Sequence, residues 1–548
     1  MVKFKNHIFI ILIFSFLVFS FYPTIFEISS AEKLKIKNRD FILEHNYYWP
    51  DFNLYLSKIR QGYENRWLAV EKYTSEPHKG SFIQIFYLYL GRFGKVLNIG
   101  PNYAYQLGRI ILSPLLLTVL LLLVTHYFTS WKWSIFAFLI TVVSGSFPHL
   151  TFVEDRLRLS RYMEWWSNID SLQRLTFIPH IIFGQIISFF LLYKLTVNRQ
   201  HTTKNKLLFY IILGNLTGLV FPPSLITLIS VLLLLSFFFY FKKKRVSDSV
   251  IYYLLFVIFS LPSLFYLFII TKTLPWSSLV EFHRTHPMMI PLDQYILGTG
   301  PVIFLGLFGG ILAIIKRKKH YFPLILWVVV TFLFASLFSL IREQSPLRFT
   351  QTGLFIPLGI LGAFLFEQVW LFVRFKKYYF ICYLLFVIFY LIINLVIMHN
   401  SLTWQLTFIR QRINADIPQV PYPPQTMYPL TEWMDGIRWL RNNSRKDDVV
   451  LAEITAGNFI PAYAGNFVYF GQSNTVDYSR KQYEVDNFFR ARLSPGQVEI
   501  LLKSGRIKFI FVGPQEREKL AGKKLEEIYP DIKYAFSNAL VTIYSTAD

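Results

Sequence analysis

The sequence predicts an α-helical polytopic membrane protein with about eleven transmembrane helices, followed by a C-terminal α/β domain outside the membrane. Of its 548 residues, 53% are hydrophobic and only 16% are charged, whereas an ordinary soluble domain has roughly 25% charged residues. A soluble core could not bury that much apolar surface, so lipid must cover the remainder. Apolar segments of near-spanning length recur up to residue 400, where the composition shifts.

The apolar segments define the predicted helices, because about 20 apolar residues cross a bilayer as a helix. They lie near residues 7–26, 105–128, 133–149, 177–196, 207–221, 224–241, 249–271, 300–315, 321–341, 352–371 and 378–398. The close pair on either side of Phe221-Pro222-Pro223 predicts either a tight outer hairpin or one broken helix.

The first apolar segment has two interpretations. Lys3 and Lys5 precede it and Ser29-Ser30-Ala31 follows it, which is the arrangement of a cleavable signal peptide. Its length of about 20 residues is closer to a full span than to a signal core of roughly 7–15 residues. We therefore expect a retained first helix.

Basic residues mark the predicted cytoplasmic ends of the helices, as the positive-inside rule requires. They are Lys3, Lys5, Lys132, Arg199, Lys204, Lys206, residues 242–245, residues 316–319, Arg374, Lys376 and Lys377. This alternation predicts a multi-pass protein of the cell membrane with its N-terminus in the cytoplasm and its C-terminal domain outside.

The formal charge of +23 does not indicate nucleic-acid binding, because the basic residues form short runs between apolar segments rather than one patch. Anionic lipid headgroups are the expected partners of those runs. The single cysteine, Cys382, lies in an apolar segment and has no partner for a disulfide. The sequence has no cysteine cluster and therefore predicts no structural zinc site of that kind.

The chain divides into a transmembrane part, 1–400, with a long first outer loop at 27–103, a linker at 401–430 and an α/β domain at 431–548. Pro421-Tyr422-Pro423-Pro424 predicts a stiff, extended segment in the linker. In the last domain, spacing predicts helices at 432–442 and 498–502 and strands at 449–454, 507–512 and 539–544.

The first outer loop contains the most informative run, Trp49-Pro50-Asp51, which opens a predicted helix. Phe52, Tyr55, Leu56 and Ile59 form an apolar stripe on it, so we expect the helix to lie along the membrane surface. A second apolar helix is predicted from residue 82 to residue 93.

This layout resembles the GT-C superfamily of membrane glycosyltransferases, most closely its protein-mannosyltransferase-like and bacterial members. The resemblance covers nearly the whole chain as an arrangement, and at motif level it rests on Trp-Pro-Asp51 with Tyr55. The Asp-Glu or Asp-Pro pair frequent in the family is absent, because Phe52 follows Asp51.

The resemblance implies transfer of a hexosyl or pentosyl group from a polyprenyl-phosphate-linked sugar to a glycan, lipid or protein acceptor at the outer face. A lipid phosphate leaves without protonation, so such a site needs one carboxylate base and cations that hold the phosphate. Asp51 is the expected base; from the residue alone, it equally suits a helix's first turn, where an acid stabilises the helix dipole.

Further candidates come from the other outer loops. Glu154 and Asp155 suit the second acidic site that GT-C enzymes often have, or a solvated cluster with neighbouring arginines. Arg348 is the best candidate for binding phosphate, since its planar fork matches phosphate oxygens. Arg342, Lys79 and His180 are weaker candidates that suit interfacial side chains equally well. The aromatic residues Trp49, Tyr162, Trp165 and Trp166 suit sugar or isoprenoid stacking, or the interfacial belt. Tyr55, beside the Trp-Pro-Asp51 run, is a further candidate for substrate binding.

The sequence assigns no metal ligand and no definite cofactor, and the lipid-linked sugar is the expected co-substrate. The resemblance leaves a divalent metal ion open, and His283, His286 and Asp293 are a weak metal set. A G-x-x-x-x-G-K-[ST] loop, which would indicate a nucleotide-driven motor, is absent. Two other functions stay open: a transporter or flippase for a lipid-linked saccharide, and a non-catalytic scaffold that displays the C-terminal domain.

Overall fold

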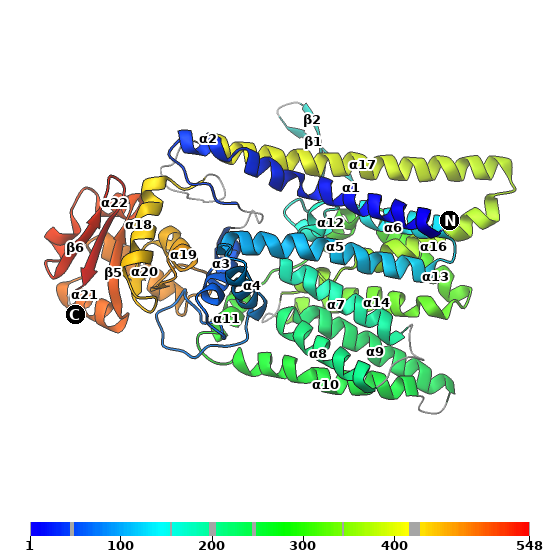
Figure 1. Cartoon of the computed structure of the whole chain (residues 1–548), viewed down its shortest axis with the longest axis horizontal. Helices are drawn as coiled ribbons and strands as arrows, with labels where there is room; N and C mark the ends of the chain where they lie inside the picture. Colours follow the sequence, from blue (N-terminus) through cyan, green and yellow to red (C-terminus); the bar gives the residue numbers. More distant parts are fainter. Residues whose placement is uncertain are drawn as a thin grey trace. The chain divides into compact units, whose positions relative to one another are not determined.

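The computed structural model describes residues 2–43, 49–153, 156–196, 204–243, 248–341, 345–415 and 428–546. The chain forms two compact units (Figure 1). Unit 1 comprises Met1–Tyr22, Arg109–Tyr266 and His286–Gln405. Unit 2 comprises Pro23–Gly108, Leu267–Thr285 and Leu406–Asp548.

The membrane part is helical, as predicted. Eight helices of the described residues are long and apolar enough to cross a membrane, or nine if the bent pair α12 and α13 is one span. The eight are α1 (Val2–Ser29), α5 (Pro101–Tyr127), α7 (Pro179–Thr196), α9 (Pro222–Lys243), α10 (Asp248–Ile270), α14 (Phe322–Leu337), α16 (Phe355–Val373) and α17 (Lys377–Asn414). The bent pair is α12 (Leu292–Thr299) and α13 (Val302–Ile315), which meet at 85°.

The count is lower than the eleven predicted spans because three apolar segments form shorter helices. These are α6 (Trp131–Val143), α8 (Lys204–Val220) and α13, with 13, 17 and 14 residues. At 1.5 Å per residue they extend only about 20–26 Å, less than the roughly 30 Å of the hydrocarbon core. The helices α8 and α9 pack side by side (Figure 1), so Phe221-Pro222-Pro223 is the turn of a helical hairpin.

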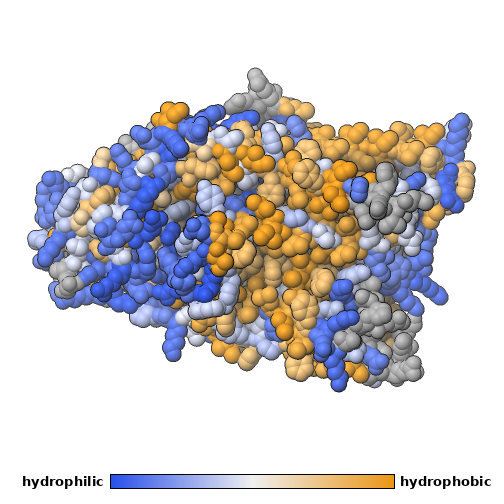
Figure 2. Space-filling model, in the orientation of Figure 1, coloured by the Kyte–Doolittle hydropathy of each residue, from blue (hydrophilic) through white to orange (hydrophobic). Residues whose placement is uncertain are grey.

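Small residues allow the apolar helices of unit 1 to pack closely. A Cβ added at Gly309 of α13 would lie 2.0 Å from the backbone oxygen of Leu361 in α16. A Cβ at Gly359 of α16 would lie 2.2 Å from the hydroxyl of Thr141 in α6. Such contacts are typical of helices that associate in lipid. Figure 2 shows hydrophobic side chains over α1 and α17, which is the surface that a bilayer covers.

The predicted span at 133–149 is partly wrong. The helix α6 ends at Val143, and the chain then forms a strand, β1 (Pro148–Val153), which pairs antiparallel with β2 (Arg156–Arg161). The short helices η1 (Ser167–Ile169) and η2 (Gln173–Leu175) follow before α7 begins.

Unit 2 contains the predicted C-terminal α/β domain. Its five-stranded sheet has the order β4-β3-β5-β7-β6, in which β3 is parallel to β4 and β5, while β7 is antiparallel to β5 and β6. The strands are β3 (Val449–Leu451), β4 (Phe467–Val468), β5 (Ile507–Val512), β6 (Ile532–Ser537) and β7 (Thr542–Thr546). The helices are α18 (Thr431–Asn443), α19 (Ile454–Tyr463), α20 (Tyr478–Phe489), α21 (Pro495–Ser504), α22 (Pro514–Leu520) and α23 (Leu525–Ile528).

The first outer loop belongs to the same compact unit as this domain. It supplies α2 (Ala31–Ile36), α3 (Trp49–Tyr63) and α4 (Ile85–Val96), and α11 (Ser277–Thr285) joins them. The Val468 backbone N–H donates to the Lys72 carbonyl at 2.9 Å, and the Thr475 hydroxyl donates to the Tyr73 carbonyl at 2.8 Å. Unit 2 therefore combines two stretches that the sequence assigned to separate domains.

Part of the predicted linker is helical, since α17 continues to Asn414. The run Pro421-Tyr422-Pro423-Pro424 lies outside the described residues.

Candidate active site

Asp51 lies in the first turn of α3, which begins at Trp49 as the sequence predicted. Its side chain is half-buried, and the next two side chains are fully buried. One of them, Asn53, donates from its amide nitrogen to the side-chain oxygen of Asn458 in α19 at 2.7 Å. The predicted base therefore stands on a helix that is fixed to the C-terminal domain.

The structure corrects the prediction that this helix lies along the membrane surface. Its apolar stripe is buried, but so are Ser57, Lys58 and Gln61 on its other faces. Gln61 donates to the Val70 carbonyl at 3.0 Å and accepts the Val70 N–H at 2.9 Å. Because partners within the chain satisfy Lys58 and Gln61, these faces of α3 are enclosed by protein, and the helix packs mainly on α4 and α19.

A buried ion pair fixes the loop that follows α3. The Lys58 ammonium lies 3.1 Å from the Glu71 carboxylate and donates to the Val70 carbonyl at 2.7 Å. Burial lowers the pKa of Lys58, while the charge of Glu71 opposes that shift. Lys58 also lies 5.4 Å from the ring centre of Trp276.

His78 completes this cluster in a defined tautomer. Its Nε2 accepts the Glu71 backbone N–H at 2.8 Å, so its Nδ1 carries the proton and donates to the Glu76 carbonyl at 2.8 Å. Burial lowers the pKa of His78, which favours this neutral form.

Two other residues singled out from the first outer loop lie in different environments. The Tyr55 ring is buried and stacks on Tyr87 of α4 at 4.3 Å between ring centres, so its contacts join α3 to α4. The Lys79 side chain is exposed. It lies in the loop that the paired backbone hydrogen bonds of Ala69 and Ser81 close.

In unit 1 the structure brings together two of the predicted phosphate-binding residues. Arg348 lies on the short helix α15 (Leu347–Thr350) and is half-buried. It lies near His180, which stands in the first turn of α7. The His180 ring packs edge-on against Phe221 at 5.9 Å. Among the described residues, no carboxylate forms an ion pair with Arg348.

Hydrogen bonds hold the turn that carries Arg348. The Trp166 indole donates to the Thr350 hydroxyl at 3.0 Å, and the Asn168 amide donates to the Thr350 carbonyl at 2.8 Å. From α7, the Gln185 amide donates to the Gln351 carbonyl at 2.7 Å. The guanidinium is therefore presented by a fixed backbone, as preorganised binding of a charge requires.

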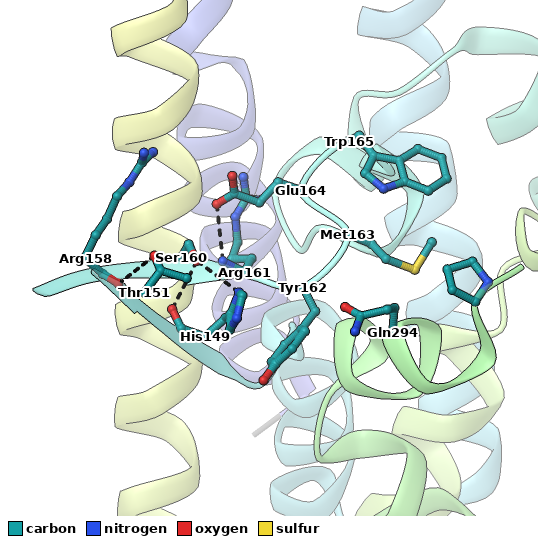
Figure 3. Close-up of a pocket in the computed structure, with 11 residues that line it drawn as sticks. His149, Thr151, Arg158, Ser160, Arg161, Tyr162, Met163, Glu164, Trp165 and Gln294 are labelled. Carbon is teal, nitrogen blue, oxygen red and sulfur yellow. Dashed lines mark hydrogen bonds between the residues drawn. The ribbon is translucent and has the colours of Figure 1, made fainter. Parts of the chain in front are cut away.

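A cavity of about 390 Å³ lies beside the β-hairpin of unit 1 (Figure 3). Its lining residues are His149, Thr151, Arg158, Ser160, Arg161, Tyr162, Met163, Glu164, Trp165, Pro291 and Gln294. The sequence singled out Tyr162 and Trp165 but missed His149 and Gln294. The available signal was the alternation of polar and apolar residues across 149–160, which indicates a strand rather than the end of a span.

Glu154, Asp155 and Arg342 lie outside the described residues. Within the described ranges, no group of three or more His, Cys, Asp or Glu side chains could hold a metal ion. The metal set suggested for His283, His286 and Asp293 is therefore wrong, because these side chains do not form such a group.

The long apolar helices of the described residues are those of a polytopic membrane protein. A scan against protein-family models finds no match, and neither does a search of curated proteins. Solved structures do match.

One is the Archaeoglobus fulgidus oligosaccharyltransferase tethered with an acceptor peptide containing the NVT sequon. Its TM-score is 0.52 at 12% identity, and the match covers 96% of this chain and 74% of that chain. Another is ArnT from Cupriavidus metallidurans bound to undecaprenyl phosphate, with a TM-score of 0.50, 9% identity, and coverage of 97% and 98%. The chain therefore has the fold of the GT-C membrane glycosyltransferases.

Proposed function

We propose that this protein is a membrane glycosyltransferase that moves a sugar from a polyprenyl-phosphate donor to a glycan, lipid or protein acceptor at the outer face. The observation that carries the proposal is the fold likeness over nearly the full length of both this chain and ArnT, whose structure contains undecaprenyl phosphate. The basic inner loops support an extracytoplasmic position for unit 2.

In this proposal Asp51 is the general base. An acceptor oxygen attacks the anomeric carbon of the donor, and the bond between that carbon and the phosphate oxygen breaks. The electron pair leaves with the polyprenyl phosphate, and the acceptor proton passes to the Asp51 carboxylate. Within unit 1, Arg348, with His180 near it, is a separate candidate for binding the phosphate of the lipid carrier.

The test uses the full chain in nanodiscs with a set of radiolabelled polyprenyl-phosphate hexoses and pentoses, and measures release of the polyprenyl phosphate. We expect Asp51→Asn to lower kcat by about 10²–10⁴, the usual contribution of a general base. The matched control is Asp248→Asn, since Asp248 is an exposed aspartate in the first turn of α10. That variant loses only an interaction with the helix dipole and keeps full activity.

Two results would contradict the proposal. The first is the absence of sugar transfer and donor hydrolysis with every donor tested. The second is an Asp51→Asn variant as active as the control, which would remove this residue from the chemistry.

A further inference from the structure

The β1–β2 hairpin of unit 1 has two different faces. Its register pairs His149 with Ser160 and Thr151 with Arg158, and these four residues line the cavity in Figure 3. The alternate residues Leu150, Phe152 and Leu157 are exposed to 60%, 77% and 60%. A hairpin with an exposed apolar face is typical of a segment at a membrane or protein boundary.

The opposite wall of the cavity is aromatic and acidic. The Trp165 side chain is 57% exposed, and the Tyr162 ring stacks on the His149 ring at 4.3 Å. One carboxylate oxygen of Glu164 accepts the Arg161 backbone N–H at 3.2 Å. Its other oxygen has no hydrogen-bond partner among the described residues. Gln294 adds an amide group from α12.

A rigid base supports this wall. Arg161 and Asp170 form an ion pair in which both side chains are buried. The Asp170 carboxylate also accepts the backbone N–H groups of Leu172 and Gln173, each at 2.9 Å. Trp166, next to Trp165, donates to Thr350 on the helix that carries Arg348. The segment that lines the cavity is thus held by a buried ion pair and joined by a hydrogen bond to the helix that carries Arg348.

We propose that this hairpin cavity binds the acceptor of the transfer reaction and that the acceptor is a neutral saccharide. The inference rests on the proposed function. The flat faces of Trp165 and Tyr162 suit the C–H face of a sugar ring, while Glu164 and Gln294 suit its hydroxyl groups. The lining carries one carboxylate, Glu164, and one exposed guanidinium, Arg158, while Arg161 is paired with Asp170. It therefore presents no net charge to a phosphate and suits a neutral saccharide. The volume of about 390 Å³ lies within the roughly 300–1,000 Å³ of small-molecule sites.

Direct binding tests the cavity without turnover. The full chain in nanodiscs is mixed with neutral tri- to hexasaccharides, and with the same saccharides carrying a phosphate, and saturation-transfer NMR measures binding. We expect binding of neutral saccharides only. Trp165→Ala lowers the affinity at least tenfold and Trp165→Phe restores most of it. The matched control is Trp67→Ala, because Trp67 is an exposed tryptophan of unit 2.

The carboxylate is tested by Glu164→Gln, which keeps an oxygen for the Arg161 N–H and removes the charge. We expect an acceptor KM at least tenfold higher, with unchanged hydrolysis of the donor when no acceptor is present. Absence of saccharide binding, equal binding by Trp165→Ala, or preference for the phosphorylated saccharides overturns the cavity assignment. A protein that binds saccharides here but uses no donor contradicts the proposed function and leaves the saccharide site standing.

Discussion

The Lys58–Glu71 pair allows a quantitative test of how the first outer loop is held. Both side chains are buried and 3.1 Å apart, so solvent screens the pair weakly. In Glu71→Gln the Lys58 ammonium keeps the Val70 carbonyl and the Trp276 ring but loses its counter-ion. Removing one partner of a buried pair costs about 3–5 kcal/mol. We expect a loss of that size in the opening free energy of α3 and residues 69–81.

Hydrogen exchange of the full chain, followed by mass spectrometry, measures this loss. The control is Glu499→Gln, which breaks an exposed pair at 2.6 Å with Lys503 and has little effect on stability, because solvent screens the pair. Glu71→Gln depresses the pKa of Lys58 further below its ordinary 10.5. Its deficit is therefore full near neutral pH, where Glu71 is ionised in the wild type and Lys58 is charged, and it shrinks as the pH rises toward 10.5. Unchanged exchange in α3, or a deficit that grows as the pH rises above neutral, refutes the reasoning.

Three further results are expected. Arg348→Ala removes a charge-assisted contact of about 1.5–3 kcal/mol. We expect the KM for the donor to rise roughly ten- to hundredfold in the assay of polyprenyl-phosphate release. An unchanged KM would show that Arg348 does not bind the phosphate. Gly91→Ala destabilises the packing of α3 on α4 by about 1–3 kcal/mol, because the added Cβ would lie 1.8 Å from the Ile59 carbonyl oxygen. A variant that unfolds at the same temperature as the wild type would contradict this prediction. Burial, with the nearby Glu453 charge, raises the pKa of Glu516 from 4.5 to about 7. The unfolded chain therefore binds fewer protons than the folded chain between those pH values. The free energy of unfolding therefore falls as the pH rises through that window, by up to about 1.4 kcal/mol per pH unit. Thermal unfolding of Glu516→Gln, measured at several pH values, should lack this dependence. If the variant keeps it, Glu516 is not the group that titrates.

Helices and strands that depend on the spacing of apolar residues in their own segment were predicted correctly. Apolar runs predicted the helices of unit 1, and the spacing of Trp433, Ile437 and Leu440 predicted α18, where all three side chains are buried. The apolar run 507–512 predicted β5 with both boundaries correct.

The errors arose where a local signal was overlooked or where distant partners decide the structure. The run Ser144-Gly145-Ser146 breaks α6 before the hairpin, and such residues mark turns. Because every second residue of the strand that follows is apolar, the predicted span was continued past this break. The polar face of α3 was expected in water, because the residues that satisfy Asn53 and enclose Lys58 lie elsewhere in the chain.

The candidate site shows the same division. The Trp-Pro-Asp51 run and its helix start could be predicted, since Pro50 and an acidic first turn are local signals. The proximity of Arg348 to His180 could not, because it depends on α7 and α15 packing together through Gln185. The hairpin cavity depends likewise on Gln294, from a different outer loop.

The pairing of α3 with the C-terminal domain has a consequence for biogenesis. Asn53 and its partner Asn458 are 405 residues apart, so the ribosome completes nearly the entire polypeptide before that bond can form. Until then the amides and charges that α3 buries remain hydrated, and its apolar stripe needs temporary cover from chaperones or lipid. A translation product that stops after the last span would therefore contain every transmembrane helix and still lack a folded first outer loop.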